Sequence, residues 1–294
     1  MTHSNARRQG LAAAARLGLL AAGLPGWTLQ AGAQTAPRLI SLSGGMTETV
    51  WALGAAELIV ATDTSSTWPE AARHTAKVGY MRQLSAEGVL ALRPTAVLGT
   101  DEVGPIGVVN QLRQAGVHLS LVPATHDLTE MLAKVQAASE ASGHRAAGAA
   151  LARQLRERWS EALLQVQRQR RASPPRVLFV MAHGGRPMSA GPGTGAHAML
   201  NHAGAVNALG GAPGYKVLSA EAVARARPDV IVTTRESIDA SGGTDAFWQH
   251  PGLAQTPAAR QRALRVHDTQ ALLGFGPRSP QALLELHRDR KSVV

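Results

Sequence analysis

Apolar and polar positions along this chain follow a pattern that predicts alternating strands and helices. Short apolar runs rich in β-branched residues predict buried strands at 38–42, 58–62, 119–122, 176–180 and around Val266. Apolar residues at helical spacing predict helices at 47–53, 108–115, 128–142, 196–209 and 281–290, and one that starts near Ala246. Turn residues dominate 65–80 and 184–195, which are predicted as loops. Strands that alternate with helices in this way indicate the α/β class.

One sequence unit occurs twice, at 84–98 and at 218–232. Both copies contain Leu-Ser-Ala-Glu, then a valine, then Arg-Pro before an apolar run. Each copy predicts a short helix capped by serine, a stop, and a buried parallel strand. Two copies that start 134 residues apart do not make a solenoid repeat. They predict two similar Rossmann-like α/β lobes with a ligand cleft between them.

A long helix is predicted between the two lobes, over 144–172. This stretch has strong helix formers and no internal proline, and the prolines at 174–175 end it. The predicted organisation is therefore an N-terminal lobe over 34–143, a connecting helix over 144–172 and a C-terminal lobe over 173–294. A single long helix between the lobes should keep any closing motion small.

The first 33 residues have the features of an export signal. Arg7 and Arg8 precede an Ala- and Leu-rich stretch, and the small residues at 31–33 predict cleavage after Ala33. The general secretory route and the twin-arginine route both remain open. Arg16 interrupts the apolar stretch, which is also short for a membrane span. We expect a periplasmic protein, without disulfides or a lipid-anchor cysteine because the sequence has no Cys.

Charge narrows the range of ligands. The full sequence carries a net charge of +10, and +7 remains without the three arginines of the expected signal. This excess fits an anionic ligand. Aromatic residues make up only 3% of the chain and are not interleaved with basic runs, so nucleic acid is not expected as a partner. The arginines between 152 and 176 are best interpreted as a solvated helix face.

Three strings resemble a known family. The sequence Lys-Val-Gly-Tyr-Met-Arg-Gln-Leu-Ser-Ala-Glu at 77–87 is similar to the haem-binding branch of the proteins that feed bacterial cobalamin, siderophore and haem importers. The strings at 41–49 and 274–278 support the same resemblance, which runs from about Pro37 to the C-terminal helix. It implies a monomeric periplasmic protein that captures ferric haem b and delivers it to an ABC permease in the inner membrane. An outer-membrane haem receptor would act upstream.

By this resemblance Tyr80 is the axial ligand of the haem iron. Ferric iron is a hard cation, and tyrosinate is one of its known axial ligands in haem proteins. Iron and a neighbouring cation both favour the phenolate. Arg82 is the candidate cation, since in an extended loop it points to the same side as Tyr80. Alternatively, Tyr80 is an aromatic side chain that seals the start of a helix, and Arg82 is an ordinary surface charge.

The second lobe is expected to supply the opposite wall. Tyr215 precedes the second copy of the repeat much as Tyr80 precedes the first, so it should lie near the same cleft, as a porphyrin contact or as a structural loop residue. Arg235 follows the second repeated strand, at the strand end where α/β sheets bind ligands. His183 is a candidate sixth ligand, and the alternative is an ordinary polar side chain on the surface. The backbone N–H groups of the Gly-rich turn at 184–195 could meet haem propionates, and Arg186 and Met188 are weaker candidates for contact there.

Two glutamates are implied as permease-docking residues by the same resemblance. In these importers one surface acid on each lobe pairs with arginines of the permease. Glu48 and Glu221 match that context. The alternative for both is an acid that interacts with the dipole of a helix N-terminus. Glu87, the internal copy of Glu221, shows that capping alone could explain this residue type.

Other functions fit the sequence less well. A cobalamin or siderophore carrier would share the fold and the docking glutamates. A zinc or manganese carrier would need histidines at ligand spacing, and only His197 and His202 come near it. An exported enzyme is not expected, because the sequence has no Gly-x-Ser-x-Gly elbow, no His-Glu-x-x-His pair and no P-loop.

Overall fold

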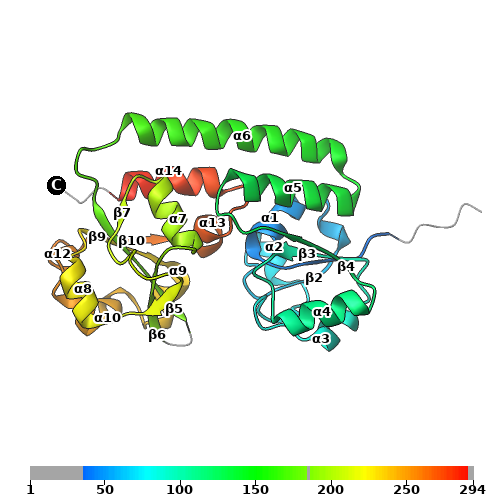
Figure 1. The fold of residues 1–294 in the computed structure, drawn as a ribbon, viewed down its shortest axis with the longest axis horizontal. Helices are drawn as coiled ribbons and strands as arrows, with labels where there is room; N and C mark the ends of the chain where they lie inside the picture. The colour runs from blue at the N-terminus through cyan, green and yellow to red at the C-terminus, as the bar shows by residue number, and fades with distance from the viewer. Residues whose placement is uncertain (1–35, 184–185, 291–294) are drawn as a thin grey trace, which may run out of the picture. The chain divides into compact units, whose positions relative to one another are not determined.

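The computed structural model describes residues 36–183 and 186–290, so the expected export signal lies outside the described residues. The described residues belong to one compact unit and contain two β-sheets, each with its own helices (Figure 1). We call them the N-terminal and C-terminal lobes. Within this part of the chain, no helix has both the length and the apolar character that a bilayer crossing requires.

The N-terminal lobe is built on a parallel sheet in the order β2-β1-β3-β4. Its strands are β1 (Leu39–Ser41), β2 (Ile59–Thr62), β3 (Ala96–Thr100) and β4 (His118–Val122). Its helices are α1 (Gly44–Ala52), α2 (Glu70–Arg73), α3 (Ala86–Leu90), α4 (Ile106–Gln114) and α5 (Leu128–Ser142), with a 3-10 turn η1 (Ala56–Leu58). Strands β1 and β3 are fully buried, as the apolar runs predict for a parallel sheet covered on both faces.

The C-terminal lobe has a mixed sheet in the order β10-β9-β5-β6-β8, with β7 also paired to β5. Its strands are β5 (Arg176–His183), β6 (Arg186–Ala190), β7 (Val206–Asn207), β8 (Tyr215–Val217), β9 (Val230–Thr234) and β10 (Leu264–His267). Its helices are α7 (Gly195–His202), α8 (Ala220–Ala226), α9 (Arg235–Ala240), α10 (Thr244–Trp248), α11 (Pro251–Ala254), α12 (Pro257–Arg260), α13 (Thr269–Leu273) and α14 (Ser279–Asp289). The α/β class and the two-lobe architecture are confirmed.

The repeated sequence unit forms the same structure in both lobes. Ser85 caps α3 and Ser219 caps α8, each through its hydroxyl oxygen and a backbone N–H three residues on. Arg93 and Arg227 then adopt the same left-handed conformation, both at φ +46°, directly before the repeated proline. The chain turns there and enters β3 or β9, both of which are fully buried. The helix, stop and strand are therefore confirmed in both copies.

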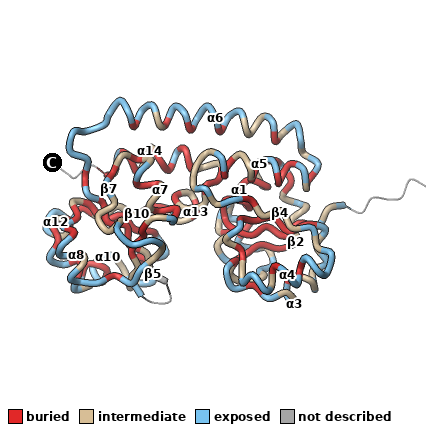
Figure 2. Tube along the Cα trace, in the orientation of Figure 1, coloured by how far each residue is buried: buried red, intermediate tan, exposed pale blue. Residues whose placement is uncertain are grey.

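Helix α6 (Arg145–Arg168) packs against α5 of the N-terminal lobe and α14 of the C-terminal lobe (Figure 1). Its buried side chains include Leu155, Trp159, Ala162 and Val166, a stripe at helical spacing, while its other faces are exposed (Figure 2). At 1.5 Å per residue it is about 36 Å long. It ends four residues earlier than predicted, because residues 169–172 are all exposed and bury no apolar face that would hold them helical.

Two predictions for the C-terminal lobe were wrong. Residues 186–190 form strand β6, antiparallel to β5, where a turn was predicted from the many glycines. Helix α7 ends at His202 instead of 209, because Gly204 takes a left-handed conformation at φ +72° and turns the chain into β7. Strand β8, which carries Tyr215, pairs with β6 and was not predicted.

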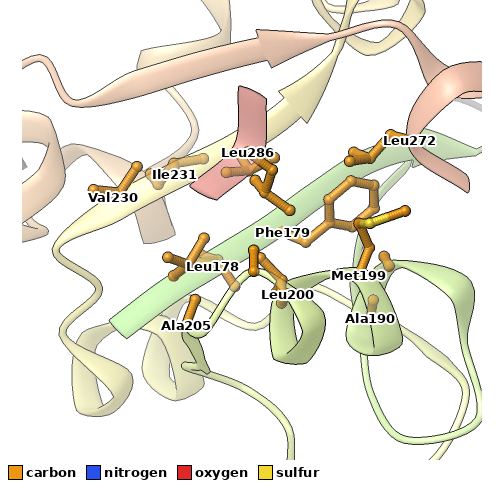
Figure 3. Close-up of a cluster of buried hydrophobic side chains, with 14 of the residues drawn as sticks. Leu178, Phe179, Ala190, Met199, Leu200, Ala205, Val230, Ile231, Leu272 and Leu286 are labelled. Atoms are coloured by element: carbon orange, nitrogen blue, oxygen red, sulfur yellow. The ribbon is translucent and has the colours of Figure 1, made fainter. Parts of the chain in front are cut away.

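The core of the C-terminal lobe forms around β5 (Figure 3). Phe179 on this strand is 1% exposed and belongs to one cluster with Met199 and Leu200 of α7, Leu272 of α13 and Leu286 of α14. Burying a side chain of this size contributes about 1.5–3 kcal/mol. Because α13 and α14 complete this cluster, the chain between them is held firmly in place.

Residues 270–278, which we call the crossing segment, link α13 of the C-terminal lobe to the N-terminal lobe. Lys134 of α5 is 1% exposed, and its Nζ donates to Glu130 Oε1 at 2.5 Å and to the Gly274 carbonyl at 2.6 Å. A Cβ on Gly45 of α1 would lie 1.8 Å from the same carbonyl oxygen, so only glycine fits there. The two lobes are thus joined by buried polar contacts as well as by α6.

Candidate functional site

Tyr80 lies in a tight turn between α2 and α3 whose backbone is fixed on both sides. The Gln83 N–H donates to the Tyr80 carbonyl at 2.8 Å, which closes a four-residue turn. Met81 within that turn is 4% exposed, and its carbonyl accepts from the Gly104 N–H at 2.9 Å. The Gly104 carbonyl accepts in turn from Leu84, which is 6% exposed. Two buried side chains and a neighbouring loop therefore hold the phenol of Tyr80 at a partly exposed position.

Arg82 joins Tyr80 to a carboxylate. Its Nη1 donates to Tyr80 Oη at 2.6 Å, and its Nη2 donates to Glu102 Oε1 at 2.5 Å. The guanidinium carbon also lies 5.9 Å from the centroid of the Tyr80 ring. Burial alone would lower the pKa of Arg82, but the Glu102 carboxylate and the Tyr80 phenol raise it, so the side chain is a permanent cation beside the phenol oxygen.

Tyr215 of β8 faces this group from the C-terminal lobe. Burial raises the pKa of Tyr215 to about 12, while Arg82 opposes this and Glu102 and Tyr80 add to it. The Arg82–Glu102 pair and the Tyr80 phenol therefore act electrostatically on the Tyr215 hydroxyl. The side chain of Thr194, the N-cap residue of α7, also acts on the Tyr215 hydroxyl and opposes the rise of its pKa. The structure thus joins Tyr80 and Arg82 by a hydrogen bond, and Tyr215 interacts with both electrostatically.

The remaining ligand candidates lie at strand ends of the C-terminal lobe. Arg235 is exposed at the first position of α9, directly after β9. His183 is the last residue of β5, and its side chain lies outside the described residues. Opposite it in the hairpin is the exposed Arg186, and Met188 pairs with Met181. Roles of these four residues in ligand binding remain predictions.

Glu48 requires a correction, because it is not a surface acid. It is 5% exposed, and its carboxylate accepts from the Arg278 backbone N–H at 2.7 Å, from Arg278 Nε at 3.0 Å and from Gln270 Nε2 at 3.2 Å. Helix α1 starts at Gly44, earlier than the predicted start at 47, so Glu48 lies inside the helix, facing the crossing segment. Its burial raises the pKa of Glu48, an effect that Arg278 opposes. We therefore assign Glu48 to the junction between the lobes.

Glu221 is an exposed acid near the start of α8. It is 76% exposed and forms an ion pair at 3.1 Å with Arg225, one helical turn on. It lies two residues after the cap Ser219, one residue short of the position at which a capping-box glutamate would reach back. Glu87 has the same place after Ser85 in α3 and is also exposed. The repeat therefore presents one matching surface carboxylate on each lobe.

Glu102 and Thr194 are the site residues that sequence reasoning missed. Glu102 follows the first repeated strand at the position that Glu236 has after the second, 134 residues on. The repeat contained a signal for Glu102, because strand ends of this kind carry ligand-binding residues. Thr194 gave no such signal, since its glycine-rich surroundings predicted only a turn.

The two histidines considered for a zinc carrier, His197 and His202, form hydrogen bonds within the protein. His197 is hydrogen-bonded to Asn201 and Asn207, and His202 Nε2 is 3.0 Å from the His126 carbonyl. Within 36–183 and 186–290, no group of three or more His, Asp or Glu side chains could hold a metal ion. A cavity of about 310 Å³ does lie in the C-terminal lobe, beside β5, α9 and α10, but Tyr80, Arg82 and Tyr215 do not line it.

Comparison with known proteins agrees with this fold. Residues 39–271 match the family model described as periplasmic binding protein. The structure is similar to that of the periplasmic heme-binding protein RhuT from Roseiflexus sp. RS-1 in apo form, with a TM-score of 0.81 and 36% identity over 87% of this chain and 98% of that one. It is also similar to the periplasmic heme-binding protein BhuT in complex with two hemes, with a TM-score of 0.80 and 42% identity over 87% of this chain and 98% of that one.

One relative is named for a different ligand. The cobalamin-binding protein of Halobacterium salinarum is 28% identical over 67% of this chain and 53% of its own length. The relatives named are thus binding proteins with haem or cobalamin in their names. We conclude that the chain belongs to the periplasmic binding protein family, among the substrate-binding proteins of ABC importers for haem, cobalamin and siderophores.

Proposed function

We propose that this protein captures ferric haem between its two lobes through the phenolate of Tyr80 and delivers it to an ABC-type haem permease. The observation that carries the proposal is the 2.6 Å hydrogen bond from Arg82 to the Tyr80 hydroxyl. A phenolate is a hard anionic donor that suits ferric iron, and a cation at hydrogen-bond distance favours that charge state. Identity of 42% to a heme-binding protein supports haem as the cargo.

The residues present fit ferric haem b. Tyr80 would supply the axial oxygen, Arg82 would hold that oxygen as an anion, and Tyr215 would face the porphyrin from the other lobe. Burial raises the pKa of Tyr215 to about 12, so this phenol remains neutral and a weak iron ligand. The proposal assigns Arg235 to contact with the haem and His183 to the sixth coordination position.

Delivery is proposed to use Glu221 together with Glu87. Glu48 matched the family context, but it is buried in an ion pair with Arg278 and offers no surface carboxylate. Glu87 and Glu221 are both exposed, and each occupies the same position of the internal repeat on its lobe. Two equivalent acids could meet arginines of the permease at the same time. We propose that the protein is an exported monomer without catalytic activity, supplied with haem by an outer-membrane receptor.

Equilibrium titration with hemin, followed by visible absorption, tests the proposal. The wild-type chain should bind hemin stoichiometrically and give a ferric spectrum with iron–phenolate charge-transfer bands. Tyr80→Phe should weaken binding at least tenfold, about 1.4 kcal/mol, and remove those bands. Tyr215→Phe is the matched control, because it removes the only other phenol in the chain and should keep the bands. Saturable hemin binding with unchanged bands in Tyr80→Phe would rule Tyr80 out as the ligand.

Cobalamin is the second candidate ligand, because the Halobacterium relative is named for it. A parallel titration with cyanocobalamin separates the two. If cobalamin binds more tightly than hemin, the haem proposal fails while the family assignment stands.

A further inference from the structure

Arg82 is held at both ends of its guanidinium group. One terminal nitrogen donates to the Tyr80 hydroxyl, and the other donates to the Glu102 carboxylate. A guanidinium group is planar and its donors have fixed directions, so a partner on one terminal nitrogen sets where the other nitrogen points. The contact with Glu102 therefore bears directly on the contact with Tyr80.

Glu102 is itself well anchored. It lies in the turn after β3, where the Asp101 N–H donates to the Val122 carbonyl at 2.9 Å and the Val103 N–H donates to the Thr100 carbonyl at 3.1 Å. Val103 is 7% exposed and fixes the turn in the core. The same turn contacts the Tyr80 loop through the hydrogen bonds of Gly104 described above. Glu102 and Tyr80 thus stand on two loops that are bonded to each other.

We infer that Glu102 is a positioning residue for haem capture, which holds the Arg82 guanidinium against the phenol oxygen of Tyr80. The inference rests on the proposed function, since it concerns the oxygen that would bind iron. A free arginine side chain loses rotamer entropy when it is ordered. With Glu102 in place, part of that ordering precedes haem binding.

Glu102 also has a second, opposite effect, and this makes the inference testable. The negative charge of Glu102 partly offsets the positive charge of Arg82. Taken alone, this effect of Glu102 disfavours a phenolate nearby. If charge were the main effect, removal of Glu102 would strengthen hemin binding. If positioning is the main effect, removal weakens it. The two side chains are 42% and 33% exposed, so the effect of their contact is moderate.

A double-mutant cycle on hemin affinity tests the inference. Glu102→Ala should weaken hemin binding about threefold to tenfold in the wild-type background and by less than about twofold in the Arg82→Gln background. Glu102→Gln keeps an acceptor oxygen and should lie between Glu102→Ala and the wild type. Glu70→Ala removes a surface carboxylate from the same lobe and should leave the affinity unchanged. Unchanged thermal midpoints of the apoproteins would show that the variants are folded.

Absorption spectra give a measurement that would not change if Glu102 only stabilised the fold. Glu102→Ala should shift the iron–phenolate charge-transfer band in the same direction as Arg82→Gln, and by less. Tighter hemin binding by Glu102→Ala, or an equal loss in both Arg82 backgrounds, would overturn the inference while Tyr80 remained the ligand. Failure of the wild-type chain to bind hemin would instead overturn the proposed function.

Discussion

Lys134→Met tests whether buried polar contacts hold the two lobes together. In the wild type, the Lys134 ammonium pairs with Glu130 and donates to the carbonyls of Gly274 and Phe275, at 2.6 and 3.4 Å. Without it the Glu130 carboxylate, which is 3% exposed, keeps only the His126 N–H and imidazole close by. Breaking a buried ion pair in this way costs about 3–5 kcal/mol.

Urea unfolding followed by circular dichroism at pH 7 measures this loss. Arg225→Met is the matched control, because it breaks an ion pair of the same helical spacing that is about three-quarters exposed. That change should cost no more than about 0.5 kcal/mol. A loss below about 1 kcal/mol in Lys134→Met would show that the buried contacts do not hold the lobes together.

The pH dependence of the same variant gives an independent check. Burial raises the pKa of Glu130, but contacts with His126 and Lys134 outweigh it and lower the pKa below 4.5 in the folded protein. A carboxyl group whose pKa is lower in the folded protein than in the unfolded chain stabilises the fold. That stability is present above the pKa in the unfolded chain and is lost as the pH falls through the pKa in the folded protein. Without Lys134 the carboxyl takes up a proton more readily, so the deficit of Lys134→Met should shrink between pH 7 and pH 5. A constant deficit would contradict this explanation.

Three further predictions follow from the same contacts. Gly45→Ala should lower the free energy of unfolding by several kcal/mol, because its Cβ would lie 1.8 Å from a backbone oxygen; a midpoint equal to the wild type in thermal unfolding would contradict this. Glu87→Ala combined with Glu221→Ala should leave hemin affinity unchanged and abolish hemin-stimulated ATP hydrolysis by the reconstituted permease; persistent stimulation would place docking elsewhere. Contact with the Glu130 carboxylate raises the pKa of His126 above 6.5, so this histidine adds stability that is lost as the pH rises above 6.5. The stability difference between wild type and His126→Gln in urea should therefore be larger at pH 6 than at pH 8, and an equal difference would show that the pair does not titrate in this range.

The fold could be predicted because its signals are local. Serine caps, the repeated Arg-Pro stop and β-branched runs are each set by a few neighbouring residues, and they recur in both lobes. Strand β6 could not be predicted in the same way, because its pairing with β5 and β8 depends on residues distant in the sequence. The predicted end of α6 was wrong for a related reason. The residues after Arg168 still favour a helix by their propensity, but they are exposed.

The candidate site was predicted from the resemblance and the internal repeat together. Tyr80 and Arg82 come from one short string, and the repeat places Tyr215 opposite them. Glu48 was misassigned because an acid near a helix start looks the same in sequence whether it faces solvent or Arg278, 230 residues away in the chain. Glu102 was overlooked because its partner Arg82 comes from another loop, and only the folded chain brings the two together.

A crystal structure of the chain grown with hemin tests the central claim most directly. The account predicts a porphyrin between the lobes with its iron bonded to the phenol oxygen of Tyr80, and with Arg82 still donating to that oxygen. An iron bonded to another side chain, or a Tyr80 hydroxyl directed away from the porphyrin, would contradict it.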